Sequence, residues 1–123
     1  MPKRILVVDD EPEIVDLLKE FLETHGFVVD SAPDASGAID RVRDNIYDAA
    51  ILDFNLPDMD GVMLHRQIRQ MDGELAQRTL FTSGLVQSEH ALGYYATHGM
   101  GFLSKPFDMQ EVLDWLETMS GPS

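Results

Sequence analysis

The 123-residue chain contains no cysteine, so neither a disulfide framework nor thiolate chemistry can belong to its fold or function. This absence fits a reducing compartment. Basic residues are scarce too: nine lysines and arginines stand against 22 acids, for a formal net charge of −13. A surface this acidic repels phosphate backbones, so we expect no direct binding of nucleic acid by this chain.

Long apolar runs are also missing. Lys3 and Arg4 precede just four apolar residues, which is too short for the core of a signal peptide. No other stretch is long and apolar enough for a membrane helix. We therefore expect a soluble, cytoplasmic protein without a membrane partner. Its length is typical of one domain.

What the chain does have is a regular alternation of short apolar runs and helical patterns. The apolar runs predict five strands, at residues 5–8, 27–29, 49–52, 79–82 and 101–104.

Apolar residues at helical spacing follow each run. The first predicted helix begins at Pro12 and stops at Gly26, the second has Asp34 as its N-cap, and the fourth spans residues 88–98. Five βα units in succession predict an α/β fold, in which a doubly wound parallel sheet carries helices on both faces.

Carboxylates follow two of these runs at the point where each strand should end. Residues 5–8 and 49–52 lack polar alternation, which predicts two central strands covered on both sides. If these strands are neighbours, the chain order reverses between them, and ligand sites in open α/β sheets lie at such a reversal. Asp9 and Asp10 follow the first strand and Asp53 ends the third, so all three carboxylates should meet there.

Two like charges about 4 Å apart cost roughly 4 kcal/mol at an effective dielectric constant near 20, so such a cluster needs relief. Either one carboxyl keeps its proton through a raised pKa, or a divalent cation sits among them. Hard oxygen ligands without cysteine or histidine favour Mg²⁺. An alternative is that residues 9–11 merely cap the first helix, and both roles are compatible.

Two more strand ends point to the same edge of the sheet. Thr82 ends the fourth strand and Ser83 follows it, and Lys105 follows the fifth strand, directly before Pro106. A lone lysine at such a place is often only a solvated charge. Together with an acidic cluster and a hydroxyl, however, it suits a phosphoryl site, because phosphoryl transfer to a carboxylate needs positioning and charge neutralisation.

The same residues resemble the receiver domain of two-component response regulators. The segments VVDDE, ILDFNLPDMDG, FTSG and GFLSKPF occur in the family's order and spacing, and the resemblance covers residues 4 to about 119. It implies a flavodoxin-like strand order of 2-1-3-4-5. It also implies a receiver domain at residues 1–119, with 120–123 as a tail or the start of a linker.

The resemblance further implies that Asp53 accepts a phosphoryl group from a phosphohistidine on a sensor histidine kinase or phosphotransfer protein. It implies that Mg²⁺ is bound directly by Asp10 and Asp53, by the backbone carbonyl of Asn55, and by Asp9 through water. Such a protein catalyses its own phosphorylation and its own dephosphorylation, and it is not a turnover enzyme on a free substrate.

By the same resemblance, Thr82, Ser83 and Lys105 hold the phosphoryl group, and the Lys105–Pro106 peptide bond is cis. Ser83 stands where the family most often has alanine or glycine, so its hydroxyl adds bulk or a hydrogen bond. Thr82 and Phe102 are the expected switch pair.

The face built from residues 88–98, the fifth strand and the last helix should contact an output partner or output domain, and a phosphorylation-linked dimer fits the same family. Two alternatives remain open. One is a phosphorylation-independent binding module with the same fold. The other is a phosphatase of the haloacid dehalogenase type, although Asn55 stands where those enzymes have their second acid.

Two other features carry weaker expectations. The four histidines share no ligand spacing and are expected at the surface or partly buried. Trp115 lies off the apolar stripe of the last helix, and we expect it either to pack within the fold or to belong to a partner surface.

Overall fold

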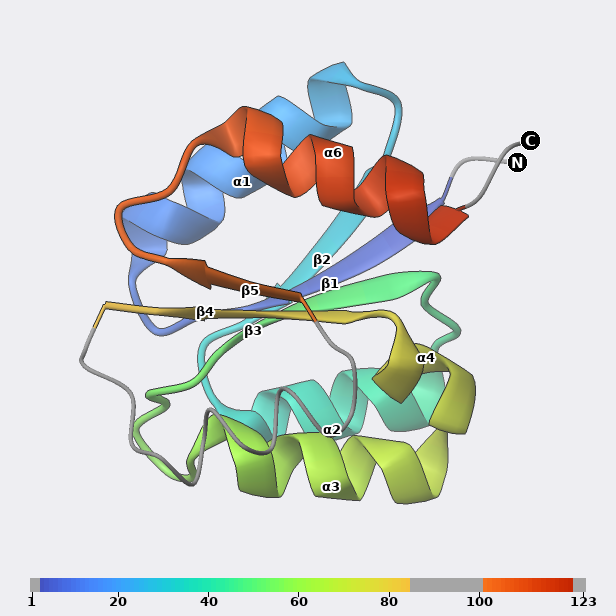
Figure 1. The fold of residues 1–123 in the computed structure, drawn as a ribbon. Helices are drawn as coiled ribbons and strands as arrows, with labels where there is room; N and C mark the ends of the chain where they lie inside the picture. The colour runs from blue at the N-terminus through green and yellow to red at the C-terminus, as the bar shows by residue number, and fades with distance from the viewer. Residues whose placement is uncertain (1–2, 85–100, 121–123) are drawn as a thin grey trace.

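The structure is a computed structural model that describes residues 3–84 and 101–120 (Figure 1). Strands and helices alternate along it. The strands are β1 (Arg4–Val8), β2 (Val28–Ala32), β3 (Ala49–Asp53), β4 (Thr79–Ser83) and β5 (Gly101–Ser104). The helices are α1 (Pro12–Thr24), α2 (Ala35–Asp44), α3 (Gly61–Met71), α4 (Gly73–Gln77) and α6 (Met109–Ser120). The helix predicted at residues 88–98 lies outside the described residues.

The five strands form one parallel sheet in the order β2-β1-β3-β4-β5, which confirms the predicted fold class and strand order. The register places Val8 opposite Leu52 on the two central strands, and Asp53 opposite Thr82 on the next pair. Every residue of β3 is buried, as expected for a strand without polar alternation.

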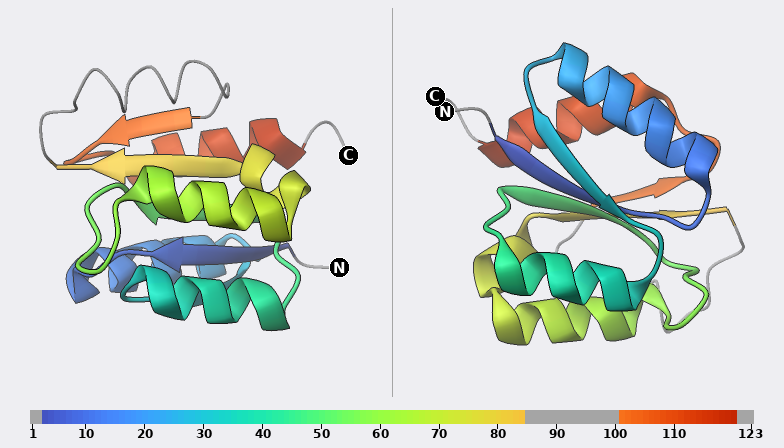
Figure 2. Two further views of the ribbon diagram at one scale, coloured as in Figure 1. Left: turned by 90° about the horizontal axis from the view of Figure 1, so that it is seen from below. Right: turned by 180° about the vertical axis from the view of Figure 1, so that it is seen from behind.

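Helices cover both faces of this sheet. In Figures 1 and 2, α1 and α6 lie on one face, and α2, α3 and α4 lie on the other. Alternate strand residues supply the two cores: Ile5 and Ile51 face α1 and α6, whereas Leu6 and Leu52 face the opposite layer. None of the helices in the described part of the chain is long and apolar enough to cross a membrane.

The N-terminus of α2 is held by two aspartates. Asp34 caps it as predicted, because its Oδ1 accepts a hydrogen bond from the Gly37 N–H at 2.7 Å. Asp58, in the loop between β3 and α3, accepts from the N–H groups of Ala35 at 2.9 Å and Ser36 at 3.0 Å. These bonds lower the pKa of Asp58, the one from Ala35 most strongly. The loop that follows Asp53 is thereby fastened to α2.

The strand β2 is longer than the predicted range 27–29 because it continues through polar residues. Burial alone would raise the pKa of Asp30, but hydrogen bonds from the Tyr47 hydroxyl and the Arg4 guanidinium, each 2.7 Å long, outweigh it and lower that pKa. Arg4 also lies 5.3 Å from the centroid of the Tyr47 ring. The paired carboxylate explains how a polar residue sits within this edge strand.

Two other expectations need correction. The five-residue helix α4 has no apolar period of its own and was not predicted. Its N-cap is Asp72, whose side chain accepts from the Leu75 N–H at 3.1 Å. His65 was expected at or near the surface, but it is buried, with its Nε2 2.8 Å from the carbonyl oxygen of Ala76. That bond ties α3 to α4. His90 and His98 lie outside the described residues.

Trp115 packs within the fold, against the α1/α6 side of the sheet. It lies directly over Gly101, the first residue of β5. A Cβ atom at Gly101 would approach the indole Nε1 and would lie 2.8 Å from the Trp115 Cδ1 and 2.9 Å from the Leu80 Cδ1. The glycine is therefore needed for this close approach of helix and strand.

We predict that Gly101→Ala destabilises the protein by about 1–3 kcal/mol, because the added methyl group overpacks this contact. Urea unfolding followed by circular dichroism measures the change. Gly73→Ala is the matched control, since a Cβ there meets nothing within 4 Å, and we expect it to be neutral or slightly stabilising. Equal destabilisation by both substitutions would contradict the packing assignment.

Candidate functional site

The carboxyl ends of four strands form one edge of the sheet. Asp9 and Asp10 follow β1, Asp53 is the last residue of β3, Thr82 and Ser83 end β4, and Lys105 follows β5. Because β1 and β3 are neighbours whose connections leave in opposite directions, their ends flank the crevice expected in an open α/β sheet. The structure thus brings together the residues that the strand ends predicted.

Strand alternation explains why these side chains converge. Asp53 continues the face of Ala49 and Ile51, and Thr82 continues the face of Leu80. Both therefore belong to the side of the sheet that α1 and α6 cover. Thr82 is 1% exposed and lies opposite Asp53 in the register, and its carbonyl oxygen accepts the N–H of Phe54 at 2.8 Å.

Four carboxylates gather at this edge. Asp9, Asp10, Glu11 and Asp53 each offer an oxygen, and these oxygens lie within 4.8 Å of one another. Asp9 and Asp53 are buried, whereas the other two are exposed. A set made of carboxylate oxygens suits a hard divalent cation, so these residues could hold a metal ion.

The capping alternative for residues 9–11 receives little support from the geometry. Glu11 is the N-cap residue of α1, but its side chain caps no helical N–H. Asp9 instead accepts the backbone N–H of Glu11 at 2.8 Å, ahead of the helix. Two of the three side chains turn toward Lys105.

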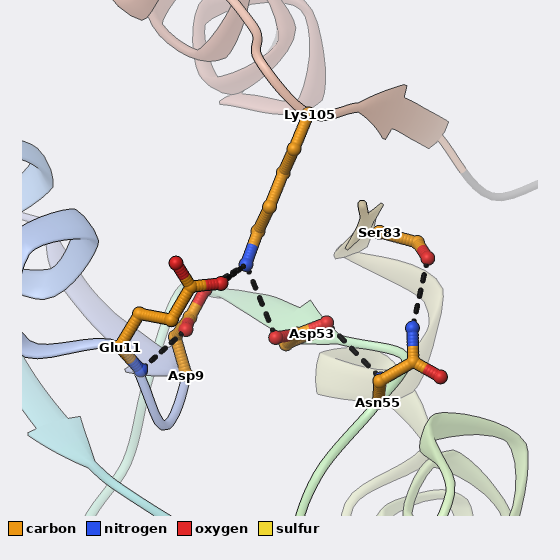
Figure 3. A network of polar contacts seen from close by, with 6 residues as sticks. All are labelled: Asp9, Glu11, Asp53, Asn55, Ser83 and Lys105. Carbon is orange, nitrogen blue, oxygen red and sulfur yellow. Dashed lines mark hydrogen bonds and ion pairs between the residues drawn. The ribbon is translucent and has the colours of Figure 1, made fainter. Parts of the chain in front are cut away.

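The ammonium group of Lys105 lies among the carboxylates (Figure 3). Its Nζ is 2.8 Å from Glu11 Oε1, 2.9 Å from Asp9 Oδ2 and 3.1 Å from Asp53 Oδ2. Burial alone would lower the pKa of Lys105, but the hydrogen bonds to Glu11 and Asp9 outweigh it, so the pKa is raised above its ordinary value. Lys105 is thus a charged partner of the cluster. Glu11 was not among the predicted metal ligands. Its contact with Lys105 joins residues 94 positions apart in the chain, and no signal in the sequence indicates it.

The Asp53 carboxylate is poised between opposing influences. Burial raises its pKa most strongly, and the negative charge of Asp9 adds to that effect. The backbone N–H of Asn55, 3.0 Å from Asp53 Oδ1, and the charge of Lys105 both act to lower it. The net result is a pKa above the ordinary value.

A neutral pair lies on the other side of Asp53 from Lys105 (Figure 3). The side-chain Nδ2 of Asn55 donates to the Oγ of Ser83 at 3.0 Å. The sequence predicted that the Ser83 hydroxyl adds bulk or a hydrogen bond, but nothing in the spacing identified Asn55 as its partner. A cavity of about 290 Å³ opens beside this pair, lined by Asp10, Glu11, Asp53, Asn55, Gly84 and Lys105.

The remaining predicted site residues lie on β5 and just after it. The Lys105–Pro106 peptide bond is cis. The Lys105 N–H donates to the carbonyl oxygen of Ser83 at 2.7 Å, which fixes the lysine against the end of β4. Phe102 is half-buried and packs against the core cluster that contains Phe81, its register partner.

Comparisons with known proteins agree with this geometry. The family model described as the response regulator receiver domain matches residues 5–117. The response regulator MprA of Mycobacterium sp. (strain KMS) is 36% identical over 113 residues, which cover 92% of this chain and 48% of that protein. The chemotaxis protein CheY of Bacillus subtilis (strain 168) is 29% identical over 115 residues, which cover 93% of this chain and 94% of that protein.

Solved structures of the same kind superpose closely. A CheY-like response regulator receiver domain protein from Methanospirillum hungatei JF-1 has a TM-score of 0.86 at 25% identity, with 98% of each chain covered. The non-phosphorylated HemR receiver domain from Leptospira biflexa has a TM-score of 0.85 at 31% identity, covering 100% of this chain and 97% of that one. The chain spans about half the length of the first curated relatives it matches, such as MprA.

We predict that Asp53→Asn stabilises the metal-free protein at neutral pH, since it removes a buried charge from a crowded carboxylate cluster. The folded-state pKa of Asp53 is raised, so the parent protein loses stability as the pH rises through that pKa, and the variant does not. The advantage should therefore be small in acid and reach about 1–3 kcal/mol at neutral pH. Urea unfolding in buffers containing EDTA, from about pH 4 to about pH 7, measures it.

Asp58→Asn is the control of opposite sign. In the parent protein the folded-state pKa of Asp58 is lowered. The stability that this carboxylate contributes is therefore present near neutral pH and lost as the pH falls through that pKa. We expect this variant to be less stable than the parent at neutral pH, with the difference shrinking in acid. Parallel pH profiles for the two variants would contradict the assigned electrostatics.

Proposed function

Since this chain belongs to the response regulator receiver domain family, we propose that it is a phosphorylation-dependent signalling switch whose phosphoacceptor is Asp53. The observation that carries the proposal is the placement of one buried carboxylate at the end of β3. It meets Lys105 at 3.1 Å and belongs to a group of four acids that could hold a metal ion. A carboxylate nucleophile beside an ammonium group and a candidate metal site suits phosphoryl transfer.

The phosphodonor in this proposal is a phosphohistidine on a sensor histidine kinase or phosphotransfer protein. An oxygen of Asp53 forms a bond to phosphorus while the bond from phosphorus to the imidazole nitrogen breaks, and that nitrogen keeps the electron pair. The product is an acyl phosphate on Asp53. The chain supplies the positioning for this step and for later hydrolysis, and it acts on no free substrate.

The proposed metal is Mg²⁺, because the donor set consists of hard oxygens at the mouth of a cavity that a phosphoryl group can enter. Asp10 and Asp53 would bind it directly, Asn55 through its backbone carbonyl, and Asp9 through water. When bound, the ion would neutralise negative charge that develops on the phosphoryl oxygens.

Lys105 and Thr82 are the proposed phosphoryl contacts of this chain. Lys105 already lies 3.1 Å from Asp53 Oδ2, so its ammonium group needs little movement to reach an attached phosphoryl oxygen. Thr82 neighbours Asp53 in the sheet register and can donate its hydroxyl proton. The resemblance also implied Ser83 as a contact, but its hydroxyl accepts the Asn55 amide at 3.0 Å, so it is not part of this proposed pair.

The proposed output follows from the same strands. Thr82 moving toward the phosphoryl group would leave space that Phe102 could fill, which would change the face formed by residues 88–98, β5 and α6. That face would contact an output partner or output domain, with dimerisation as one consequence. We place these events in the cytoplasm. Of the three segments, β5 and α6 belong to the described residues.

We predict that incubation with acetyl phosphate and Mg²⁺ adds the mass of one phosphoryl group to the intact protein. Asp53→Asn should abolish the addition, whereas Asp40→Asn, which alters an exposed carboxylate on α2, should not. Intact-mass spectrometry provides the measurement. An unchanged mass in the parent protein under several phosphodonors would favour a phosphorylation-independent binding module. Steady release of phosphate from many small esters would favour a phosphatase.

We also predict that Asp10→Asn weakens Mg²⁺ binding about tenfold or more, because it removes a direct carboxylate ligand while leaving Lys105 and its partners in place. Isothermal titration calorimetry measures the affinity. The matched control is Asp16→Asn, which removes the same charge from an exposed position on α1, outside the group of four acids. Equal weakening by both substitutions would show that the net charge, and not a ligand at position 10, determines binding.

A further inference from the structure

The hydrogen bond between Asn55 and Ser83 joins the loop after β3 to the end of β4. Asn55 belongs to the loop after β3, and Ser83 ends β4. The amide Nδ2 donates to the Ser83 Oγ at 3.0 Å, while the backbone N–H of the same asparagine donates to Asp53 Oδ1 at 3.0 Å. Asn55 is therefore fixed from both ends beside the phosphoacceptor.

Ser83 is a rigid anchor for this bond. It is 1% exposed, it pairs with Ser104 of β5 in the sheet register, and its carbonyl oxygen accepts the Lys105 N–H at 2.7 Å. Its side chain continues the face of Phe81, opposite to the face of Thr82 and Asp53. The serine hydroxyl thus holds the Asn55 amide on the far side of Asp53 from the ammonium group of Lys105 (Figure 3).

Asn55 also lines the cavity that opens onto Asp53. The other lining residues are three acids, Lys105 and Gly84. Glycine has no side chain, and the nearest atoms to a Cβ at Gly84 would belong to Lys105, 3.7 Å away. Among the lining residues the Asn55 amide is the neutral side chain that can both donate to and accept from a water molecule.

Resting on the proposed function, we propose that Ser83 is a positioning residue that lengthens the lifetime of the phosphoryl group on Asp53 by holding the Asn55 amide away from the hydrolytic water. In that hydrolysis, the water oxygen bonds to phosphorus as the bond from phosphorus to the Asp53 oxygen breaks. The Asp53 oxygen keeps the electron pair, and both water protons leave with the phosphate as dihydrogen phosphate. The bond to Ser83 holds the amide in one orientation, whereas a released amide is free to turn toward that water.

The test compares rates of dephosphorylation after acetyl phosphate is removed, at saturating Mg²⁺. Ser83→Ala should raise the first-order rate constant roughly three- to tenfold, the effect expected of one neutral hydrogen bond. Ser104→Ala makes the same substitution at the register partner on β5, which is exposed, and should change the rate by less than about twofold.

A double-mutant cycle separates this role from a general loosening of the site. In an Asn55→Ala background, Ser83→Ala should no longer accelerate dephosphorylation, because no amide remains to be released. The Mg²⁺ affinity and the urea midpoint of the same four proteins should not change in parallel with the dephosphorylation rate. In the unphosphorylated protein, Ser83→Ala but not Ser104→Ala should shift the NMR signals of the Asn55 side-chain amide.

Each outcome bears on one proposal in a distinct way. An unchanged lifetime in Ser83→Ala, or an equal acceleration in the Asn55→Ala background, would overturn the role of Ser83 and leave Asp53 as the phosphoacceptor. Failure of the parent protein to take up a phosphoryl group would overturn the proposed function, and this inference with it.

Discussion

One ammonium group meets three carboxylates at the carboxyl edge of the sheet, and this contact governs the site. Lys105 binds Asp9, Glu11 and Asp53 together. Because like charges about 4 Å apart repel by roughly 4 kcal/mol at an effective dielectric constant near 20, the cluster needs this partner. A single lysine still leaves most of the negative charge uncompensated. Burial raises the pKa of Asp53 most strongly, and the negative charge of Asp9 adds to that effect. The charge that Lys105 leaves uncompensated explains why the proposed chemistry combines an entering phosphoryl group with a divalent cation.

The sequence predicted the fold and the convergence of the acids because both follow from regular geometry. Apolar runs without alternation identified the central strands, and parallel strands all end at the same edge. Once β1 and β3 are neighbours, Asp9 and Asp53 must meet, whatever the details of the loops. The direct binding of a metal by Asp10 and the switch roles of Thr82 and Phe102 came from resemblance to a family, and they stay predictions that geometry alone does not test.

What the sequence did not reveal depends on single contacts between distant segments. No periodicity connects Asn55 with Ser83. The full length of β2 was not predicted, because its polar residue Asp30 is stabilised by Arg4 and Tyr47, which lie elsewhere in the chain. The burial of His65 depends on a carbonyl in α4, a helix too short to show an apolar period. Trp115 left two possibilities open until Gly101 was seen beneath it. In each case a specific partner, and not a pattern, decides the outcome.

Asp58 accepts two hydrogen bonds from the start of α2, so the site is held more firmly on the α2 side than on the β4 side. On that flank the segment leaving Asp53 is anchored to a helix, just as Arg4 and Tyr47 clamp the outer strand through Asp30. Strain created at Asp53 would have to break ionic or charge-assisted bonds to spread in that direction. Toward β4 it would meet the Asn55–Ser83 bond, which joins two neutral side chains and yields more readily. In the proposed switch, a displacement would therefore spread more easily toward β4 than toward α2.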